Sequence, residues 1–258
     1  MIFTDSHTHL YAEEFDNDRD EMILRAQHNN ALYLLLPAID SKYHERMLQV
    51  SRDYSTLCYP MMGLHPTSVK ENYQAELDII ADYLVNPDFN FYAIGEVGID
   101  LYWDKTFEAE QRLAFSSQMD MALKFDLPLV IHTRNSMDIA LSMVEERCDP
   151  KLRGVFHCFS GNIQQAERAV RLGFMLGIGG VVTYKNSGLQ AVVEHIGLAH
   201  LLLETDAPWL PPVPHRGQRN EPSYIPVIAQ KVAEIKNSSL EHVASVTTAN
   251  TKKLFNIL

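Results

Sequence analysis

The stretch Leu129-Val130-Ile131-His132 shows the pattern that decides the fold, a short apolar run that ends in a polar and chemically versatile side chain. Successive apolar residues are typical of a strand that is covered on both faces, as in a parallel sheet. The same pattern recurs at Gly154-Val155-Phe156-His157 and at Leu201-Leu202-Leu203-Glu204-Thr205-Asp206. We therefore expect a parallel sheet whose strands carry polar groups at one end.

Short apolar runs of this kind recur along the whole chain. Each is followed by a polar or glycine-containing turn and then by a longer segment with helical periodicity. One such segment places Ile163, Ala166 and Val170 on a single helical face. The eight expected strands are residues 2–4, 32–36, 57–62, 91–94, 129–131, 154–156, 174–178 and 201–203. This alternation predicts an α/β fold of eight βα units.

Eight βα units in 258 residues match a (β/α)8 TIM barrel, although an open, doubly wound sheet has the same periodicity. Polar residues favour the barrel, because they follow the first, third, fourth, fifth, sixth and eighth expected strands. A closed barrel brings these ends together, whereas an open sheet spreads them along one edge. No linker or internal repeat divides the chain, so we expect one domain over residues 1–258.

The composition indicates a folded protein that acts away from membranes. Hydrophobic residues make up 46% and charged residues 21%, as in average globular proteins. The longest apolar stretch, residues 31–39, contains Pro37 and is far shorter than the ~20 residues that span a bilayer. The N-terminus lacks the pattern of a signal peptide, and three cysteines without CxxC spacing argue against a disulfide framework. We therefore expect a cytoplasmic protein.

The charge balance limits how the protein could hold a polyanion. Lys and Arg number 22 against 33 Asp and Glu, which gives a formal net charge of -11 at pH 7. Such a charge opposes broad adhesion to duplex DNA or to anionic lipid. Any nucleic acid must therefore be held by a local group of cations. The sequence indicates no membrane partner and no obligate protein partner.

Six residues at the expected strand ends have the chemistry of metal ligands, namely His7, His9, Glu96, His132, His157 and Asp206. In extended chain the two rings of an HxH pair point to one side, although an isolated pair could equally be hydrogen-bonded turn histidines. Glu96 directly follows an apolar run, and a buried carboxylate needs a counter-charge. One catalytic zinc usually needs only three protein ligands. We therefore expect two divalent metal ions per chain that share a bridging group, with Zn, Mg or Mn as candidates.

Two further residues are candidates for substrate contacts beside the ligands. His65 follows the third expected strand, and we expect it to contact substrate or to support a ligand rather than to bind metal. Arg134 either binds a pair of phosphate oxygens or pairs with a structural carboxylate. Three aromatic residues near these motifs either stack on unpaired bases or pack within loops, namely Tyr102, Trp103 and Trp209.

A compact basic segment contains His215, Arg216 and Arg219. On a protein of net charge -11, this segment is a natural local grip for a nucleic-acid backbone, so Arg216 and Arg219 are candidate substrate-binding residues. The alternative is that the two arginines bridge loop carboxylates such as Glu221.

A series of motifs connects these residues to a known family. The motifs are HTH at 7–9, GEVGID at 95–100, IHTR at 131–134, GVFHCFSG at 154–161 and LLLETDAPWLPPVPHRGQRNEP at 201–222. The series resembles the TatD family of metal-dependent hydrolases, and the resemblance extends over essentially the whole chain. It implies a TIM barrel of the amidohydrolase superfamily with 3′ to 5′ deoxyribonuclease activity. It also implies that His7, His9 and Asp206 hold one metal, that His132 and His157 hold the second, and that Glu96 bridges them.

The expected activity is hydrolysis of phosphodiester bonds at single-stranded 3′ ends of DNA, by water that a divalent pair activates. Glu96 and Asp206 are the candidate catalytic residues. Similarity to the superfamily implies that Asp206 also accepts a proton from the attacking water, and the alternative is a ligand with no role in proton transfer. The same activated water could instead cleave a carboxylic ester or an amide, as in an aminoacyl-tRNA deacylase. A third interpretation is a metal-binding protein without catalysis.

Overall fold

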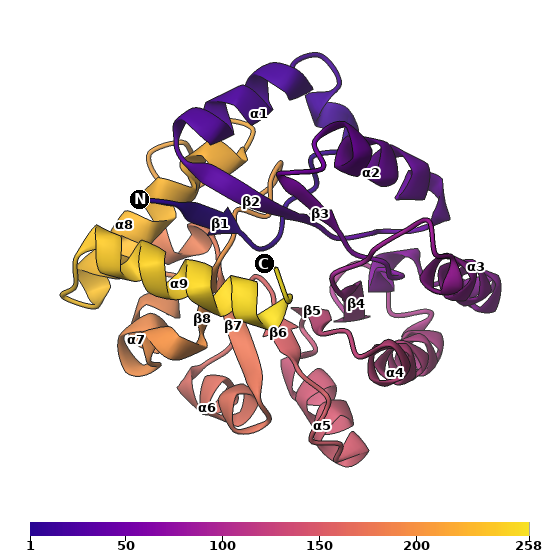
Figure 1. The fold of residues 1–258 in the computed structure, drawn as a ribbon. Helices are drawn as coiled ribbons and strands as arrows, with labels where there is room; N and C mark the ends of the chain where they lie inside the picture. The colour runs from indigo at the N-terminus through magenta and orange to yellow at the C-terminus, as the bar shows by residue number, and fades with distance from the viewer. Residues whose placement is uncertain (258) are drawn as a thin grey trace.

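The computed structural model describes residues 1–257, in which eight parallel strands alternate with helices. The strands are β1 (Phe3–Asp5), β2 (Ala31–Leu36), β3 (Cys58–Pro60), β4 (Ile94–Asp100), β5 (Leu129–Arg134), β6 (Gly154–Phe156), β7 (Phe174–Ile178) and β8 (Leu201–Leu203). The helices are α1 (Arg19–His28), α2 (Ser41–Asp53), α3 (Tyr73–Val85), α4 (Glu108–Phe125), α5 (Met137–Arg147), α6 (Ile163–Arg171), α7 (Leu189–His195), α8 (Ile225–Ile235) and α9 (Leu240–Leu254). Figure 1 shows the strands inside a ring of helices.

Two sets of strands close into one barrel. Their orders are β1-β2-β3 and β4-β5-β6-β7-β8, with every pair parallel. Between β3 and β4, the Gly95 N–H donates to the Met62 carbonyl at 3.0 Å. Between β8 and β1, the Ser6 N–H donates to the Leu203 carbonyl at 2.9 Å. These bonds confirm the predicted TIM barrel and exclude the open sheet, so the carboxyl ends of the strands surround one mouth.

The bounds of β4 and β5 differ from the prediction. The expected strand 91–94 ends where the observed strand Ile94–Asp100 begins, and β5 continues past the expected 129–131 to Arg134. Glycine weakens the strand signal in the sequence of β4. At Gly98, with φ at +132°, a Cβ atom would lie 2.2 Å from the His132 carbonyl oxygen. Only glycine allows β4 to approach β5 this closely. The residue that weakens the strand signal in the sequence is therefore also the one that allows the two strands to pair.

Two apolar cores hold the barrel together. One lies between the strands and the surrounding helices. The other fills the barrel with side chains from most of the strands or the segments beside them, namely Leu35, Met61, Ala93, Val130, Val155 and Leu202. Helix α9 crosses one end of the barrel in Figure 1, and Leu254, Phe255 and Ile257 complete the interior core. Phe255 borders residues that precede β4 and β5, so this plug closes the end where strands begin.

Within residues 1–257, every helix is too short or too polar to cross a lipid bilayer.

Replacing Phe255 with Ala tests the role of this plug. Phe255 is 1% exposed, so the change leaves a cavity in the barrel and lowers the free energy of unfolding by about 3–5 kcal/mol. Urea unfolding followed by circular dichroism measures the effect. Leu113→Ala is the matched control, because Leu113 is 56% exposed on α4. Equal small losses in both variants would show that the plug does not stabilise the barrel.

Candidate metal centre

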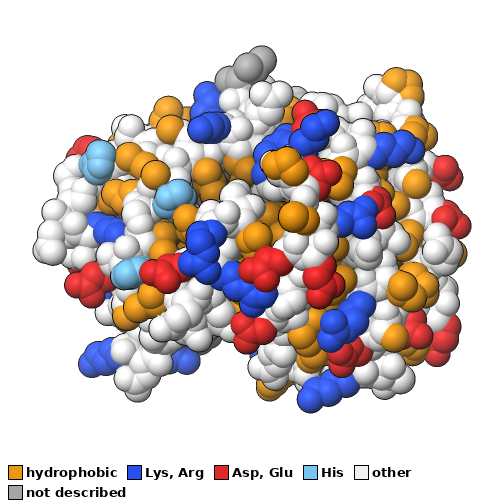
Figure 2. Space-filling model, turned by 90° about the horizontal axis from the view of Figure 1, so that it is seen from below, with side chains coloured by type: hydrophobic (Ala, Val, Ile, Leu, Met, Phe, Trp, Pro, Cys, Tyr) orange, Lys and Arg blue, Asp and Glu red, His pale blue; other side chains and the backbone are white. Residues whose placement is uncertain are grey.

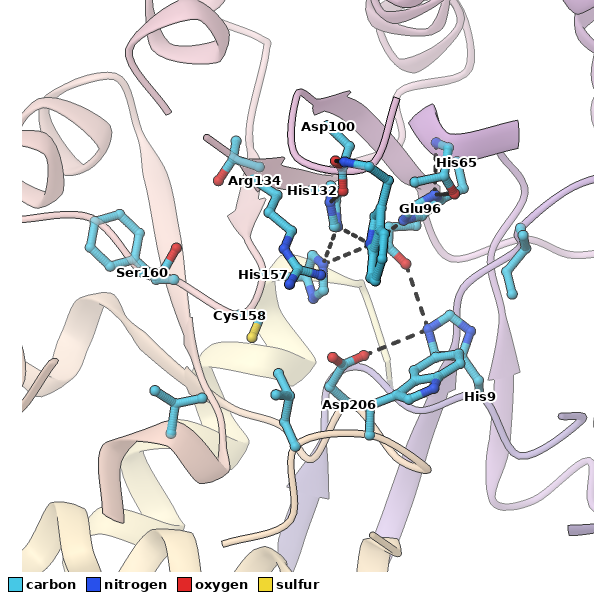
Figure 3. A pocket seen from close by; sticks show the side chains of 18 residues that line it. His9, His65, Glu96, Asp100, His132, Arg134, His157, Cys158, Ser160 and Asp206 are labelled. Atoms are coloured by element: carbon cyan, nitrogen blue, oxygen red, sulfur yellow. Dashed lines mark hydrogen bonds and ion pairs between the residues drawn. The ribbon is translucent and has the colours of Figure 1, made fainter. Parts of the chain in front are cut away.

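The barrel brings all six predicted ligands together at its mouth. They come from five strands or the segments just after them: His7 and His9 follow β1, Glu96 lies in β4, His132 lies in β5, His157 follows β6 and Asp206 follows β8. The rings of His7 and His157 stack with their centroids 3.8 Å apart. Figure 3 shows side chains from these separate elements pointing toward one another.

Glu96 lies at the centre of the cluster, and its two carboxylate oxygens face different histidines. Oε2 lies 3.2 Å from His7 Nε2 and 3.5 Å from His9 Nε2. Oε1 lies 2.8 Å from His132 Nδ1 and 2.7 Å from His157 Nε2. A carboxylate that presents one oxygen to each of two ligand groups has the arrangement of a group that bridges two cations.

Asp206 joins the group formed by His7 and His9. Its Oδ1 atom lies 3.7 Å from the Nε2 atoms of both histidines. Its backbone has φ at +58°, a left-handed conformation that Asp tolerates better than most residues, and its N–H donates to the His7 carbonyl at 2.9 Å. We call His7, His9, Asp206 and Oε2 of Glu96 the first ligand group, and His132, His157 and Oε1 of Glu96 the second.

A hydrogen bond behind the His9 ring fixes which nitrogen faces the cluster. The Tyr11 hydroxyl donates to the Pro37 carbonyl at 2.6 Å, so the same oxygen accepts from His9 Nδ1 at 2.9 Å. With its proton on Nδ1, the neutral His9 ring presents a lone pair on Nε2 to the cluster. This is the tautomer that a metal ligand requires.

Two buried carboxylates occupy the corresponding places behind the second ligand group. Asp100 Oδ2 lies 2.9 Å from His132 Nε2, and Glu204 Oε1 lies 3.6 Å from His157 Nδ1. Asp100 therefore draws the His132 proton away from the cluster and leaves a lone pair directed toward it. His157 Nδ1 forms no hydrogen bond among residues 1–257, and Glu204 acts on this ring through its charge.

Sequence analysis missed the roles of Asp100 and Glu204, although both lie within the motifs quoted above. Asp100 lies four residues after Glu96 in the same strand, which places the two carboxylates on one face. A buried carboxylate needs a partner, so this spacing could have identified Asp100. The Glu204 side chain fits in its position only because β7 has a glycine beside it. A Cβ atom at Gly177 would lie 2.3 Å from Glu204 Oε2, and the sequence near Glu204 gives no sign of this contact.

The pKa values of the ligand histidines shift in opposite directions. Against the opposing effect of burial, Asp100 and Glu96 raise the pKa of His132, and Glu96 with Glu204 raises that of His157 well above its usual value. Burial has the larger effect on His7 and His9. It lowers the pKa of His7 and takes that of His9 well below its usual value, so both rings are neutral, as metal ligands must be. Burial, together with the negative charge of Glu96, raises the pKa of Asp206 to about 8. Burial also opposes the charge on Glu96, but His157 and neighbouring histidines outweigh it and hold its pKa well below the usual range. Two carboxylates buried here call for a compensating cation, so the residues fit a metal site.

His65 contacts the same cluster as the opposite tautomer. Its Nε2 lies 3.1 Å from Glu96 Oε1, while its Nδ1 accepts the Thr67 N–H at 3.1 Å. The neutral ring therefore carries its proton on Nε2 and faces the cluster as a donor. This geometry supports the interpretation of His65 as a residue that contacts substrate or supports a ligand.

A cavity of about 650 Å³ opens over the cluster, a volume that suits a small ligand. Arg134 is the one Arg or Lys among its lining residues within 1–257, and its guanidinium stacks 4.0 Å from the Tyr102 ring centroid. Arg134 forms no ion pair with another residue in this range, so the structural carboxylate that was its alternative partner is not found there. Trp103 and Trp209 line the same cavity and are 68% and 44% exposed.

The structure separates the two arginines of the basic segment. Arg219 donates to both carboxylate oxygens of Asp18 at 2.7 Å and to the Glu14 carbonyl at 2.6 Å. These contacts support the structural role that was the alternative for Arg219, so a role in substrate binding is proposed for Arg216 and not for Arg219. Arg216 is exposed, stacks 4.6 Å from the Tyr184 ring centroid and forms no ion pair with a residue in 1–257. It keeps its charge available to a ligand.

Basic side chains elsewhere lie among acidic ones. Figure 2 shows this mixture on the face that lies below in Figure 1. Arg168 of α6, for example, pairs with Glu145 of α5. Such a surface gives a polyanion little long-range attraction.

A TIM barrel with buried histidines and carboxylates converging at its mouth is the architecture of a metal-dependent hydrolase. The chain belongs to the TatD family, since the family model described as TatD related DNase matches residues 4–256. It is 35% identical over 258 residues to the metal-dependent hydrolase YabD of Bacillus subtilis, covering 100% of both chains. It is 33% identical over 256 residues to the metal-dependent hydrolase YjjV of Escherichia coli, covering 99% of this chain and 98% of YjjV.

Solved structures agree with this assignment. The crystal structure of the Escherichia coli TatD homologue YjjV matches with a TM-score of 0.93 at 31% identity, over 99% of this chain and 98% of that one. A TatD family hydrolase from Entamoeba histolytica matches with a TM-score of 0.86 at 21% identity, over 99% and 98% of the two chains.

Proposed function

We propose that this protein is a TatD-type deoxyribonuclease that hydrolyses phosphodiester bonds at single-stranded 3′ ends of DNA with the help of two divalent metal ions. The observation that carries the proposal is the position of Glu96, whose two carboxylate oxygens face separate ligand groups beneath an open cavity. Divalent ions bound there, with Zn, Mg or Mn as candidates, would lower the pKa of a coordinated water and polarise a phosphoryl oxygen.

The chain supplies the proton acceptor. One ion would be held by His7, His9 and Asp206, and the other by His132 and His157. Glu96 would contribute to both sites. Asp206 is the ligand with a second task, because its side chain is 13% exposed and lines the cavity where an attacking water must lie. From this position its carboxylate can accept a proton from that water.

Two donors are placed to bind the scissile phosphate. His65 presents Nε2–H toward the cluster, and Arg134 extends from β5 into the same cavity, as Figure 3 shows. A guanidinium binds two phosphate oxygens at once, and the aromatic ring beneath it limits the conformations it can adopt.

Two exposed tryptophan side chains at the cavity support the proposal that the substrate is single-stranded. Trp103 follows β4 and Trp209 follows β8, which are strands on opposite sides of an eight-stranded barrel. Stacking of a base on such a ring is worth about 1–3 kcal/mol, and it needs a base that is free of its duplex partner. The acidic, mixed surface also gives little attraction for duplex DNA.

A second candidate is an ester or amide hydrolase such as an aminoacyl-tRNA deacylase. The apolar part of the cavity wall favours this candidate. Beside Arg134, the lining includes Ile39, Phe159, Val181 and Leu210. Such walls would accept an aminoacyl side chain as readily as a base. A metal-binding protein without catalysis would have no use for an open cavity over the ligands.

We also propose a cytoplasmic location. All three cysteines are free in the structure, and a reducing compartment would keep them so.

A panel of substrates separates the two enzymatic candidates. We expect the metal-loaded protein to shorten a single-stranded oligonucleotide from its free 3′ end, and to act slowly on a 3′-blocked strand and on a blunt duplex. Gel analysis of 5′-labelled substrates measures this, beside hydrolysis of aminoacyl and nitrophenyl esters. The double variant His132→Ala, His157→Ala controls for contaminating nucleases. Rapid ester hydrolysis without a ladder of shortened strands would favour the deacylase.

Asp206→Asn tests the proton acceptor. The amide keeps the size and one oxygen that can contact a cation, but it removes nearly all basicity. We expect kcat to fall by roughly 10² to 10⁴ with little change in KM, the usual scale for loss of a general base. The measurement is kcat at saturating metal, with occupancy determined in the same sample. Asp126→Asn, at an exposed position, is the control. Turnover near that of the wild type in a fully metallated variant would leave Asp206 with ligation alone.

Arg216→Ala and Arg219→Ala have different expected effects. Loss of Arg216, which has no ion pair with a residue in 1–257, raises KM for an oligonucleotide and reduces the slope of log affinity against log salt by about 1. Loss of Arg219 lowers the Tm, because Asp18 keeps only Arg25 as an ion-pair partner within 1–257 and the Glu14 carbonyl loses a donor, and it leaves the salt slope unchanged. Titrations at several salt concentrations and thermal melts of both variants check this. A changed slope in Arg219→Ala alone would reverse the assignment.

A further inference from the structure

We propose that Asp100 and Glu204 are positioning residues that retain the metal ion held by the second ligand group, so that loss of their charges releases this ion selectively. The juxtaposition that carries the inference is a buried carboxylate behind each of the two histidines in that group. The inference rests on the proposed two-metal centre and is independent of the substrate.

Asp100 is held in place before any metal binds. It is 1% exposed, and its Oδ1 atom accepts the N–H groups of Tyr102 and Trp103 at 2.9 and 3.2 Å. Gln111 fixes its backbone, since Gln111 Oε1 accepts the Asp100 N–H at 2.9 Å. The remaining oxygen, Oδ2, therefore stays directed at His132 Nε2, 2.9 Å away.

Glu204 is buried more completely and has fewer partners. It is 0% exposed, and its Oε1 atom accepts the Cys158 N–H and faces His157 Nδ1 at 3.6 Å. Its Oε2 atom has no hydrogen-bond partner among residues 1–257. A buried carboxylate oxygen without a partner is costly unless positive charge lies nearby. The group best placed to provide it is the His157 ring, whose other nitrogen faces the cluster where a cation would be held.

The first ligand group is supported differently. Behind His9 the acceptor is the neutral Tyr11 hydroxyl. His7 Nδ1 and His157 Nδ1 both lack a hydrogen-bond partner among residues 1–257, but His157 Nδ1 faces the Glu204 carboxylate at 3.6 Å. This group instead contains a second carboxylate, Asp206, directed at the cluster itself. The first ion thus receives its negative charge directly, from Asp206 and Glu96.

In the second ligand group, Glu96 is the only carboxylate that faces the cluster. The negative charges of Asp100 and Glu204 would act on a bound ion through the rings of His132 and His157. A carboxylate that accepts the outer N–H of a ligating imidazole fixes the ring and makes its inner nitrogen a stronger donor. Loss of such a partner typically weakens metal binding by about 10- to 100-fold. The two ions should therefore respond differently when these outer carboxylates are neutralised.

The test compares Asp100→Asn, Glu204→Gln and the double variant with the wild type. These changes keep the side-chain size and remove the negative charge. Tyr11→Phe is the matched control, because it removes the acceptor behind His9 in the first group. Metal per chain is measured by elemental analysis after dialysis against limiting Mn²⁺ or Zn²⁺. The dissociation constants come from competition with a chromophoric chelator.

We expect two ions in the wild type and loss of affinity for one of them, by about 10- to 100-fold, in each single variant. The double variant should hold one ion and lose the magnetic coupling of a Mn²⁺ pair in its electron paramagnetic resonance spectrum. Adding His132→Ala to the double variant should remove no further metal, which identifies the lost ion. Tyr11→Phe should keep the ion of the second group.

Two ions bound with wild-type affinity in the double variant would overturn the inference, as would a single ion in the wild type. Circular dichroism of the metal-free proteins shows which variants fold, and either single variant decides the question alone. Metal counting does not depend on catalysis, so a failure of the proposed nuclease activity is a separate result.

Discussion

The burial of the Glu96 carboxylate among histidine rings is the constraint on which the rest of the structure depends. Glu96 is 3% exposed, and four imidazoles approach its oxygens at distances of 2.7 to 3.2 Å from His7, His65, His132 and His157. Such an arrangement needs rigid support, because unpaired charge in an apolar interior is strongly unfavourable. Closure of the barrel supplies that support by fixing β4 and β5 beside each other and joining β1 to β8. The plug formed by Leu254, Phe255 and Ile257 fills the end of the barrel opposite the cluster.

Hydrogen bonds outside the cluster decide what three of the histidines offer to it. Tyr11 and Asp100 draw the proton of a ring nitrogen of His9 and His132 outward, which leaves a lone pair facing inward. Thr67 does the reverse for His65 and leaves a donor facing inward. Glu204 instead places a negative charge 3.6 Å behind the His157 ring. The same residue type therefore serves two purposes within one site. Four histidines suit a cation, while His65 suits the oxygen of an anionic group.

Electrostatics on the outer surface follow a different rule. The acidic chain pairs most of its arginines with carboxylates, as Arg219 pairs with Asp18 and Arg168 with Glu145. Arg134 and Arg216 are exceptions, because each stacks on an aromatic ring and forms no ion pair with a residue in 1–257. Charges that are paired with carboxylates give a polyanion little long-range attraction, which supports the proposed recognition of a strand end over coating of a long surface.

The sequence by itself determined the class of fold and the six converging side chains, because apolar strands ended by His or carboxylate are a local pattern. It also indicated the family through motifs that span the chain. It failed at the start of β4, where glycines concealed a strand that only the close approach of β5 explains. It could not separate Arg216 from Arg219, since their different partners lie on segments distant in the chain. Nor could it assign Asp100, Glu204 and Tyr11 to particular histidines. Tertiary structure decided these roles, because a hydrogen bond depends on the meeting of two atoms in space and not on the spacing of residues within either segment alone.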